Sequence, residues 1–291
     1  MPSGASEVFE LLTPESQNEA LDRGLVALPE MNGKGIVLTW RMSISDGLGV
    51  KSNTTYDIYR NETLIKENLA NVTNYVDANG KSTDSYYITV KQDGEVKETS
   101  KTVTPWTRIY KTLQLDRPAG GTLAGTAYDH TPNDMSVADL DGDGEYELIV
   151  KWNPSNSHDN SESGYTSEVF IDAYKMDGTK MWRVSLGKNI RAGAHYTQFL
   201  AYDFDGDGKA EMICKTAPGS KDGLGNYVTA AATVAAIKNA TDNEADYRNS
   251  NGYILSGNEY LTVFNGETGA AMHTIWYVPD RGPGLPGGKA A

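Results

Sequence analysis

The chain has 291 residues, with 26 basic and 39 acidic side chains and a net charge of −13. This length suffices for one large or two ordinary domains, and the acidity argues against nucleic acid as the main partner. The single cysteine, Cys214, excludes a disulfide framework within the chain, and no apolar stretch is long enough to span a membrane.

The first hundred residues predict a β-sandwich behind a polar arm. Residues 1–23 are polar and are expected to form the arm. From 24 to 104, short alternating strands are separated by turn signals about every eight to twelve residues, which is typical of a β-sandwich. The strand patterns at 35–41, 55–60 and 85–90 resemble those of a fibronectin type III domain, whose usual role is structural.

Thr104-Pro105-Trp106 marks the predicted start of a second domain, 105–291, which opens with a bridging stretch up to residue 135. Two copies of one acidic cassette follow, at 139–151 and 203–215. Both read D-x-D-G-D-G-x-x-E, then three apolar residues, then lysine. We interpret this domain as a β-propeller built around the cassettes.

The cassettes have the pattern of calcium loops. Carboxylates at alternate positions direct oxygens around a hard cation, the glycines permit a tight turn, and calcium fits best. Strand-type apolar runs flank both loops, so we expect loops between strands rather than EF-hands. The alternative is an acidic turn without metal, which a second copy in the same register disfavours. The predicted ligands are the side chains of Asp139, Asp141, Asp143, Glu147, Asp203, Asp205, Asp207 and Glu211, and the backbone carbonyls of Glu145 and Lys209.

Each cassette is followed by an insertion and then a hairpin, with Asp177-Gly178 or Asn265-Gly266 at its turn. Four strands, one calcium loop and one tight turn make one propeller blade. A propeller needs at least about four blades to close, whereas this sequence holds two. We therefore expect the N-terminal part of a longer protein; the alternative is a two-blade protein that closes by oligomerising.

Two lysines, Lys151 and Lys215, end the cassettes. We expect the strand that leaves each calcium loop to be the inner strand of its blade, which would bring both lysines to the axis and present positive charge to an anionic ligand. The other interpretation is two solvated residues at strand ends. His195 lies just before the second cassette, where it is either structural or a candidate base.

Polar and aromatic residues near the lysines suggest contacts with sugar. Trp152 and Tyr196 could stack on sugar rings, and the two asparagines that follow Trp152 could bond hydroxyl groups. Asp172 is a lone carboxylate inside an apolar strand, where it needs a cation or a hydrogen-bond partner. The predicted substrate-binding residues are Trp152, Asn153, Asn156, Asp172, Arg191 and Tyr196.

From about residue 17 to about residue 280 the sequence resembles the rhamnogalacturonan lyases of polysaccharide lyase family eleven. The resemblance implies an eight-bladed, calcium-rich propeller that bacteria secrete and that degrades the pectin backbone, rhamnogalacturonan I. It also implies a monomer when the protein is full length. The segments that carry the resemblance are 136–147, 151–156, 159–160, 171–175, 190–199, 215–219 and 276–279.

The chemistry implied by the resemblance is β-elimination at galacturonate. Calcium bound to the sugar carboxylate acidifies C5 as a Lewis acid, a base removes the C5 proton, and the link through O4 to rhamnose is cleaved as the oxygen leaves C4. Lys151, Lys215 and His195 are the candidate bases, and a base from another part of the protein is equally open. We expect endo action.

Two other functions remain open from the sequence. A non-enzymatic calcium propeller, acting as a carbohydrate-binding or adhesion module, would carry the same loops. A propeller hydrolase would need paired carboxylates at a defined separation, but the acids here are committed to the metal loops. Weak calcium loops suit a place where calcium is plentiful, so we expect an extracellular protein in its mature form, since no signal peptide is visible.

Overall fold

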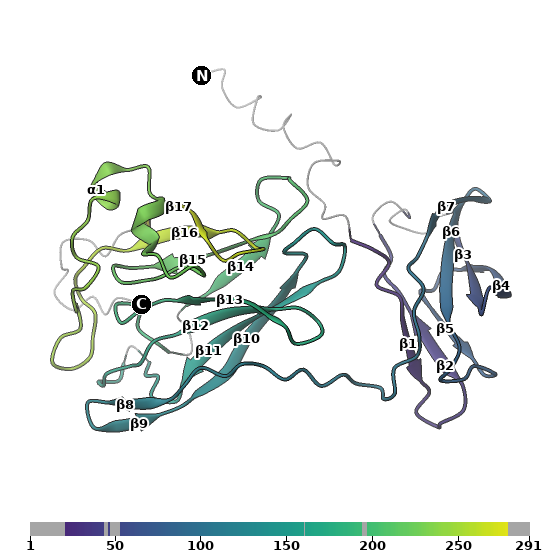
Figure 1. Ribbon diagram of the computed structural model, residues 1–291, viewed down its shortest axis with the longest axis horizontal. Coiled ribbons are helices and arrows are strands. Elements are labelled where there is room, and N and C mark those ends of the chain that lie inside the picture. The colour runs from purple at the N-terminus through teal and green to yellow at the C-terminus, as the bar shows by residue number, and fades with distance from the viewer. Residues whose placement is uncertain (1–20, 44–45, 47–52, 160, 194–196, 279–291) are drawn as a thin grey trace, which may run out of the picture. The chain divides into compact units, whose positions relative to one another are not determined.

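The computed structural model describes residues 21–43, 46, 53–159, 161–193 and 197–278. Its chain divides into two compact units, of which the first spans Leu21–Thr112 and the second begins at Leu113. Both are built almost entirely from antiparallel strands (Figure 1). The all-β fold class predicted from the sequence is therefore confirmed.

The first unit is a two-sheet sandwich. One sheet has the strand order β1-β2-β5 and the other β4-β3-β6-β7, the arrangement of a fibronectin type III domain. The three strands predicted from the sequence are β2, β3 and β6. The strands are β1 (Val26–Pro29), β2 (Ile36–Thr39), β3 (Thr54–Arg60), β4 (Thr63–Ala70), β5 (Asn74–Asp77), β6 (Tyr86–Gln92) and β7 (Glu95–Thr99).

The core of the sandwich is made by both sheets. Leu38 from one sheet and Ile58 and Ile88 from the other are fully buried in one cluster. The ring of Trp40 meets that of Tyr56 edge-on, with 5.1 Å between ring centroids. Alternate residues of β2, β3 and β6 face this core, as expected for sheets with one solvated face.

Arg23 belongs to the sandwich although the sequence places it in the arm. Its side chain is buried, and Nη1 donates to Asp46 Oδ2 at 2.5 Å. Its Nε donates to Glu98 Oε2 at 2.8 Å. The two carboxylates compensate the buried charge, which a sequence pattern does not reveal.

The second unit repeats one four-stranded meander. The first sheet has the order β10-β11-β12-β13 and the second β14-β15-β16-β17. A short hairpin, β8-β9, precedes them in the stretch that the sequence analysis left as a bridge. The elements are β8 (Gly121–Leu123), β9 (Thr126–Tyr128), β10 (His130–Ala138), β11 (Glu147–Pro154), β12 (Phe170–Tyr174), β13 (Lys180–Ser185), β14 (Phe199–Tyr202), β15 (Glu211–Thr216), η2 (Val228–Ala231), α1 (Ala235–Lys238), β16 (Tyr260–Phe264) and β17 (Ala271–Trp276).

Both predicted hairpins form, but their turns differ. In the first, Gly178 adopts a φ of 92°. In the second, Asn265 N donates to Ala270 O at 2.9 Å, and the glycine with positive φ is Gly269, at 69°. The second turn is therefore longer than a two-residue Asn-Gly turn. Gly266 is needed for space instead, because a Cβ there would lie 1.9 Å from Ala210 O.

The two sheets share one core. Ile149 and Val184 of the first sheet cluster with Met212 and Phe264 of the second. Trp182 Nε1 of the first sheet donates to the backbone oxygen of Gly266, in the hairpin turn of the second sheet, at 2.6 Å. Face-to-face packing of repeated meanders is the construction of propeller blades. The described sheets do not close a barrel or a propeller among themselves.

One sequence expectation about the sheets is wrong. The strands that leave the acidic loops, β11 and β15, are the second strands of their sheets rather than inner edge strands. Strands β10 and β14 hold the edge positions, and these two strands approach each other. In the described part of the chain, no helix has both the length and the apolar character needed to cross a membrane.

Candidate functional site

A buried aspartate organises each acidic loop. In the first loop, Asp139 accepts hydrogen bonds from the N–H groups of Gly142 at 2.8 Å and Gly144 at 2.9 Å. Glu147, at the start of β11, accepts the N–H of Leu140 at 2.8 Å. The two glycines have φ angles of 78° and 86°, a conformation that glycine adopts without strain.

The second loop repeats these bonds at equivalent positions. Asp203 accepts from the N–H groups of Gly206 at 2.6 Å and Gly208 at 2.9 Å. Glu211 accepts the N–H of Phe204 at 2.9 Å. The repeated motif in the sequence thus produces one repeated loop in space.

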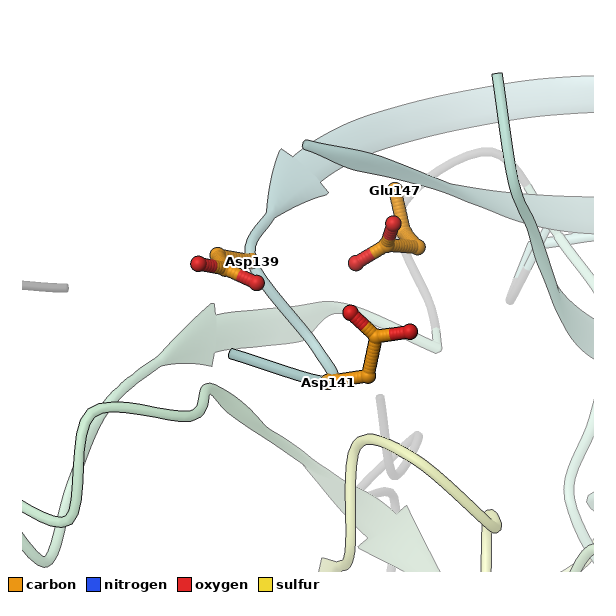
Figure 2. A group of neighbouring side chains, drawn as sticks. All are labelled: Asp139, Asp141 and Glu147. Atoms are coloured by element: carbon orange, nitrogen blue, oxygen red, sulfur yellow. The ribbon is translucent and has the colours of Figure 1, made fainter. Parts of the chain in front are cut away.

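Three carboxylates gather in each loop, with one oxygen of each lying within 4.8 Å of the others. Figure 2 shows the first group, in which the carboxylates of Asp141 and Glu147 point toward each other. Clustered hard oxygen ligands fit a calcium ion. The two groups are Asp139, Asp141 and Glu147, and Asp203, Asp205 and Glu211.

The first group also has the electrostatics of a cation site. Asp141 Oδ1 is buried and has no hydrogen-bond partner among the described residues. Burial, together with the neighbouring charge of Asp141, raises the pKa of Glu147 to about 7. Burial likewise raises the pKa of Glu211 in the second group. A divalent cation would supply the missing partner and offset the repulsion between carboxylates.

The other predicted ligands lie outside these groups. Asp143 Oδ1 accepts the N–H of Glu145 at 2.9 Å, and Asp207 Oδ1 accepts the N–H of Lys209 at 2.8 Å. Both aspartates therefore shape the turn with one oxygen. Metal binding through the backbone carbonyls of Glu145 and Lys209 stays a prediction.

A lysine that the sequence analysis did not single out lies beside the first group. Lys175, directly after β12, pairs with Asp141. Its Nζ also lies 3.4 Å from Asp143 Oδ2 and 3.8 Å from Glu147 Oε1. In the sequence, Lys175 lies between an apolar strand and the Asp177-Gly178 turn, which places it at the end of a hairpin. Its position beside the acidic loop depends on the pairing of β11 with β12, which the sequence pattern does not show.

A direct bond joins the two loops. Ala210 N donates to Asp139 O at 2.7 Å, which links a residue of the first carboxylate group to the neighbour of Glu211 in the second. The side chain of Lys209 lies against Gly142, since a Cβ at that glycine would be 3.1 Å from Lys209 Cγ. The two candidate metal loops are therefore adjacent.

The two cassette lysines occupy different environments. Lys151 is fully buried, and its Nζ lies 2.5 Å from Asp134 Oδ2 on β10. Lys215 keeps 22% of its side chain exposed, and its Nζ lies 3.1 Å from Glu259 Oε1. Each is paired with a carboxylate that the sequence analysis did not identify. Lys151 is therefore not a solvated strand-end residue, and substrate cannot reach its amine directly.

Asp172 is the centre of a buried network in the first sheet. It accepts from Trp152 Nε1 at 2.9 Å and from Tyr174 Oη at 2.6 Å. Arg183 donates to it twice, with Nε at 2.7 Å and Nη2 at 2.6 Å. Asp172 thus has both the cation and the hydrogen bonds that a buried carboxylate requires. It is fully buried, so none of its surface is available to a sugar.

Most other predicted sugar contacts are also engaged within the protein. The Trp152 side chain is only 3% exposed, so its ring offers no face for stacking. Asn156 is buried and bonds Ser167, and Asn153 donates to Ser157 at 3.1 Å. His195 and Tyr196 lie outside the described residues, so their predicted roles stay predictions.

Arg191 holds two insertions together. Its Nη1 donates to the backbone oxygens of Gly164 at 3.0 Å and Gly252 at 2.6 Å, and its Nη2 donates to that of Glu162 at 2.7 Å. The guanidinium carbon lies 5.0 Å from the ring centroid of Tyr253. The insertion after β11 and the one before β16 are thereby fixed to each other.

A cavity of about 380 Å³ lies beside the β8-β9 hairpin. Tyr128 and Phe170 provide aromatic walls, and Lys188 and Arg248 provide positive charge. Glu168 also lines it and accepts a hydrogen bond from Ser185. Aromatic walls beside cations are suited to a sugar that carries a carboxylate.

Comparison with known proteins identifies the relatives of this chain. Residues 110–288 match the model for rhamnogalacturonan lyase family 11, C-terminal domain. The chain belongs to rhamnogalacturonan lyase family 11. Residues 16–106 match a second model, the β-sheet domain of rhamnogalacturonan I lyases, so the sandwich is also typical of such lyases.

Two relatives of the family 11 chain come from Bacillus subtilis (strain 168). The rhamnogalacturonan endolyase YesW is 48% identical over 267 residues, which are 91% of this chain and 40% of YesW. The rhamnogalacturonan exolyase YesX is 46% identical over 269 residues, 91% of this chain and 41% of YesX. The crystal structure of YesX superposes with a TM-score of 0.82 at 46% identity, covering 92% of this chain and 42% of that one. This chain thus spans about 40% of the length of the relatives it matches.

Proposed function

We propose that the protein is a secreted, calcium-dependent lyase that cleaves rhamnogalacturonan I. The observation that carries the proposal is family membership across both units, with an endolyase and an exolyase each similar over 91% of the chain. Both relatives are named for rhamnogalacturonan, so the proposed substrate is this anionic backbone of pectin. We propose a monomer that acts outside the cell on plant cell walls.

The proposed reaction is β-elimination at a galacturonate. The C5 proton leaves to a base, the bond between C4 and the O4 shared with rhamnose breaks, and a C4–C5 double bond forms. When bound, calcium withdraws electron density from the sugar carboxylate and so acidifies C5. No oxidant or water is needed, because the leaving oxygen takes up a proton.

Lys215 is a more accessible candidate base than Lys151. Its side chain is partly exposed, whereas that of Lys151 is fully buried. The amine lies 5.5 Å from the ring centroid of Tyr277, which adds an aromatic surface beside it. His195 remains the other candidate. The pair Glu259–Lys215 would have to open before the amine could accept a proton.

The cavity beside the β8-β9 hairpin supports the proposed substrate class. Lys188 suits a uronate carboxylate, whereas Arg248 is already paired with Asp246, and the aromatic residues suit an apolar sugar face. We propose endo action, as in the endolyase among the relatives. The exolyase among the relatives makes the mode of cleavage the point that most needs measurement.

The test is to incubate the protein with rhamnogalacturonan I and follow the ultraviolet absorbance of the unsaturated uronate, with and without a calcium chelator. A calcium-dependent rise supports elimination. New reducing ends without absorbance would instead indicate a hydrolase. Binding with no cleavage would favour the alternative, a carbohydrate-binding module. Product sizes separate endo from exo action, since only endo action makes long fragments early.

A further inference from the structure

The first acidic loop differs from the second at one charged position. Lys175 follows β12 and Asn265 follows β16. The strand pairing makes these positions equivalent. Tyr174, just before Lys175, pairs with Leu148, and Phe264, just before Asn265, pairs with Met212. Leu148 and Met212 each directly follow the glutamate of their cassette. One loop therefore faces an ammonium group and the other an amide.

The ammonium of Lys175 lies among the oxygens that would bind the metal. It pairs with Asp141, and its distance to Glu147 Oε1 is 3.8 Å. By contrast, no lysine or arginine in the described part of the chain forms an ion pair with Asp203 or Glu211. The first loop thus has an internal cation, whereas the described residues supply none of this kind to the second loop.

The side chain of Lys175 can leave without disturbing the fold. Its backbone is held in the turn, since Lys175 N donates to Thr179 O at 2.9 Å. The side chain is 37% exposed and can swing into solvent while the strand stays in place. A calcium ion and the ammonium cannot both hold the same oxygens, because like charges at this distance repel strongly.

We propose that Lys175 is a tethered competitor for calcium that makes the first loop the weaker of the two calcium sites. The inference rests on the proposed calcium dependence and adds an order of filling. The second loop fills first as calcium rises. The first loop stays charge-compensated by Lys175 until calcium is abundant.

The test measures calcium binding rather than activity. Calcium is titrated by isothermal calorimetry into the full chain and into Lys175→Asn, which carries the residue of the second loop. Asp141→Asn and Asp203→Asn assign each binding step to a loop. Lys180→Asn is the matched control: it removes the same charge from the same hairpin, but this lysine pairs with Asp116 and not with the carboxylate group.

Lys175→Asn should tighten calcium binding at the first loop about tenfold or more, because an opposing unit charge a few ångströms from the ion is removed. Lys180→Asn should leave both steps within about twofold, since its charge is more distant and screened. Circular dichroism confirms folding, and Lys175→Gln replaces the asparagine variant if that one unfolds.

Unchanged affinity in both Lys175 variants would overturn the proposal, as would an equal gain in the Lys180 variant. Those outcomes would leave the proposed calcium dependence intact, because calcium would still bind. Absence of any calcium step assigned to either loop would overturn the calcium dependence and this inference together.

Discussion

The two sheets of the second unit have the same strand arrangement but different side chains at equivalent positions. At three equivalent positions the first sheet has Trp152, Asp172 and the partly exposed Arg183, and the carboxylate of Asp172 accepts hydrogen bonds from the other two. In the second sheet, the equivalent positions are occupied by three threonines, Thr216, Thr262 and Thr274. Their hydroxyls are in line, with Thr262 Oγ1 lying 2.7 Å from Thr216 Oγ1 and 3.2 Å from Thr274 Oγ1.

The comparison shows that the repeated sheet requires hydrogen-bonded side chains at these positions but tolerates either charged or neutral ones. Both sets are satisfied by hydrogen bonds, so both are compatible with a buried strand pairing. The charged set is the more sensitive, because loss of Asp172 or Arg183 breaks the ion pair between them. The hydroxyl set loses only neutral hydrogen bonds. Conserved geometry between the sheets therefore does not imply equal sensitivity to mutation.

The largest effect should come from breaking the charged set. Asp172→Ala removes the acceptor of Trp152 Nε1 and the nearest carboxylate of Arg183, whose other carboxylate contact is the longer one with Asp116 at 3.7 Å, and should lower the free energy of unfolding by about 3–5 kcal/mol. Thr262→Val, at the equivalent position, should cost about 1 kcal/mol because it removes neutral hydrogen bonds. Urea unfolding of both variants makes the comparison. Equal costs would show that the charge at Asp172 adds nothing to stability.

Calcium removal should come next and should act through the acidic loops. At free calcium one hundred times the dissociation constant, loss of one site lowers stability by about 2.7 kcal/mol. Thermal unfolding with and without chelator measures this loss. In Asp203→Asn the chelator should have a smaller effect than in the unaltered protein. An unchanged chelator effect in that variant would place the stabilising ion elsewhere.

The hairpin turns give a smaller contrast. Gly266→Ala would place a Cβ 1.9 Å from Ala210 O, and the overpacking should cost about 2 kcal/mol. At Gly178 the nearest atom to such a Cβ is 3.4 Å away, so only the positive φ opposes alanine, at about 1 kcal/mol. Melting temperatures of the two variants test the order. A milder Gly266 variant would mean that the turn shifts freely.

The smallest effect should be at Cys214, whose equivalent in the first sheet is Val150. Cys214→Val should change stability by less than about 1 kcal/mol, since both positions are buried in apolar clusters. Burial raises the pKa of the thiol to about 12, so the reactive thiolate is absent at neutral pH and reactivity rises only toward that pKa. A thiol reagent at neutral pH should label the protein only after unfolding; rapid labelling of native protein would contradict the burial.

Local patterns in the sequence were sufficient for the sheets and loops, because strand alternation and the acidic spacing act within a few residues. They did not reveal the partners of Lys151 and Lys215. Asp134 and Glu259 reach those lysines only through strand pairing and an insertion. The β8-β9 hairpin was missed because its three-residue strands are too short to show a period. Its turn, Ala124-Gly125, lacks the asparagine or aspartate that signals such turns.

The bond from Ala210 N to Asp139 O joins unlike ends of two like loops. The equivalent groups in the repeat are the N–H of Tyr146 and the carbonyl of Asp203, so each loop presents one donor position and one acceptor position. This contact is head-to-tail, because the donor and the acceptor lie at different positions of the loop. If the same contact were repeated, each four-stranded sheet would be rotated by the same angle relative to the one before it. The acidic loop is then both a candidate ion site and a connector between successive meanders.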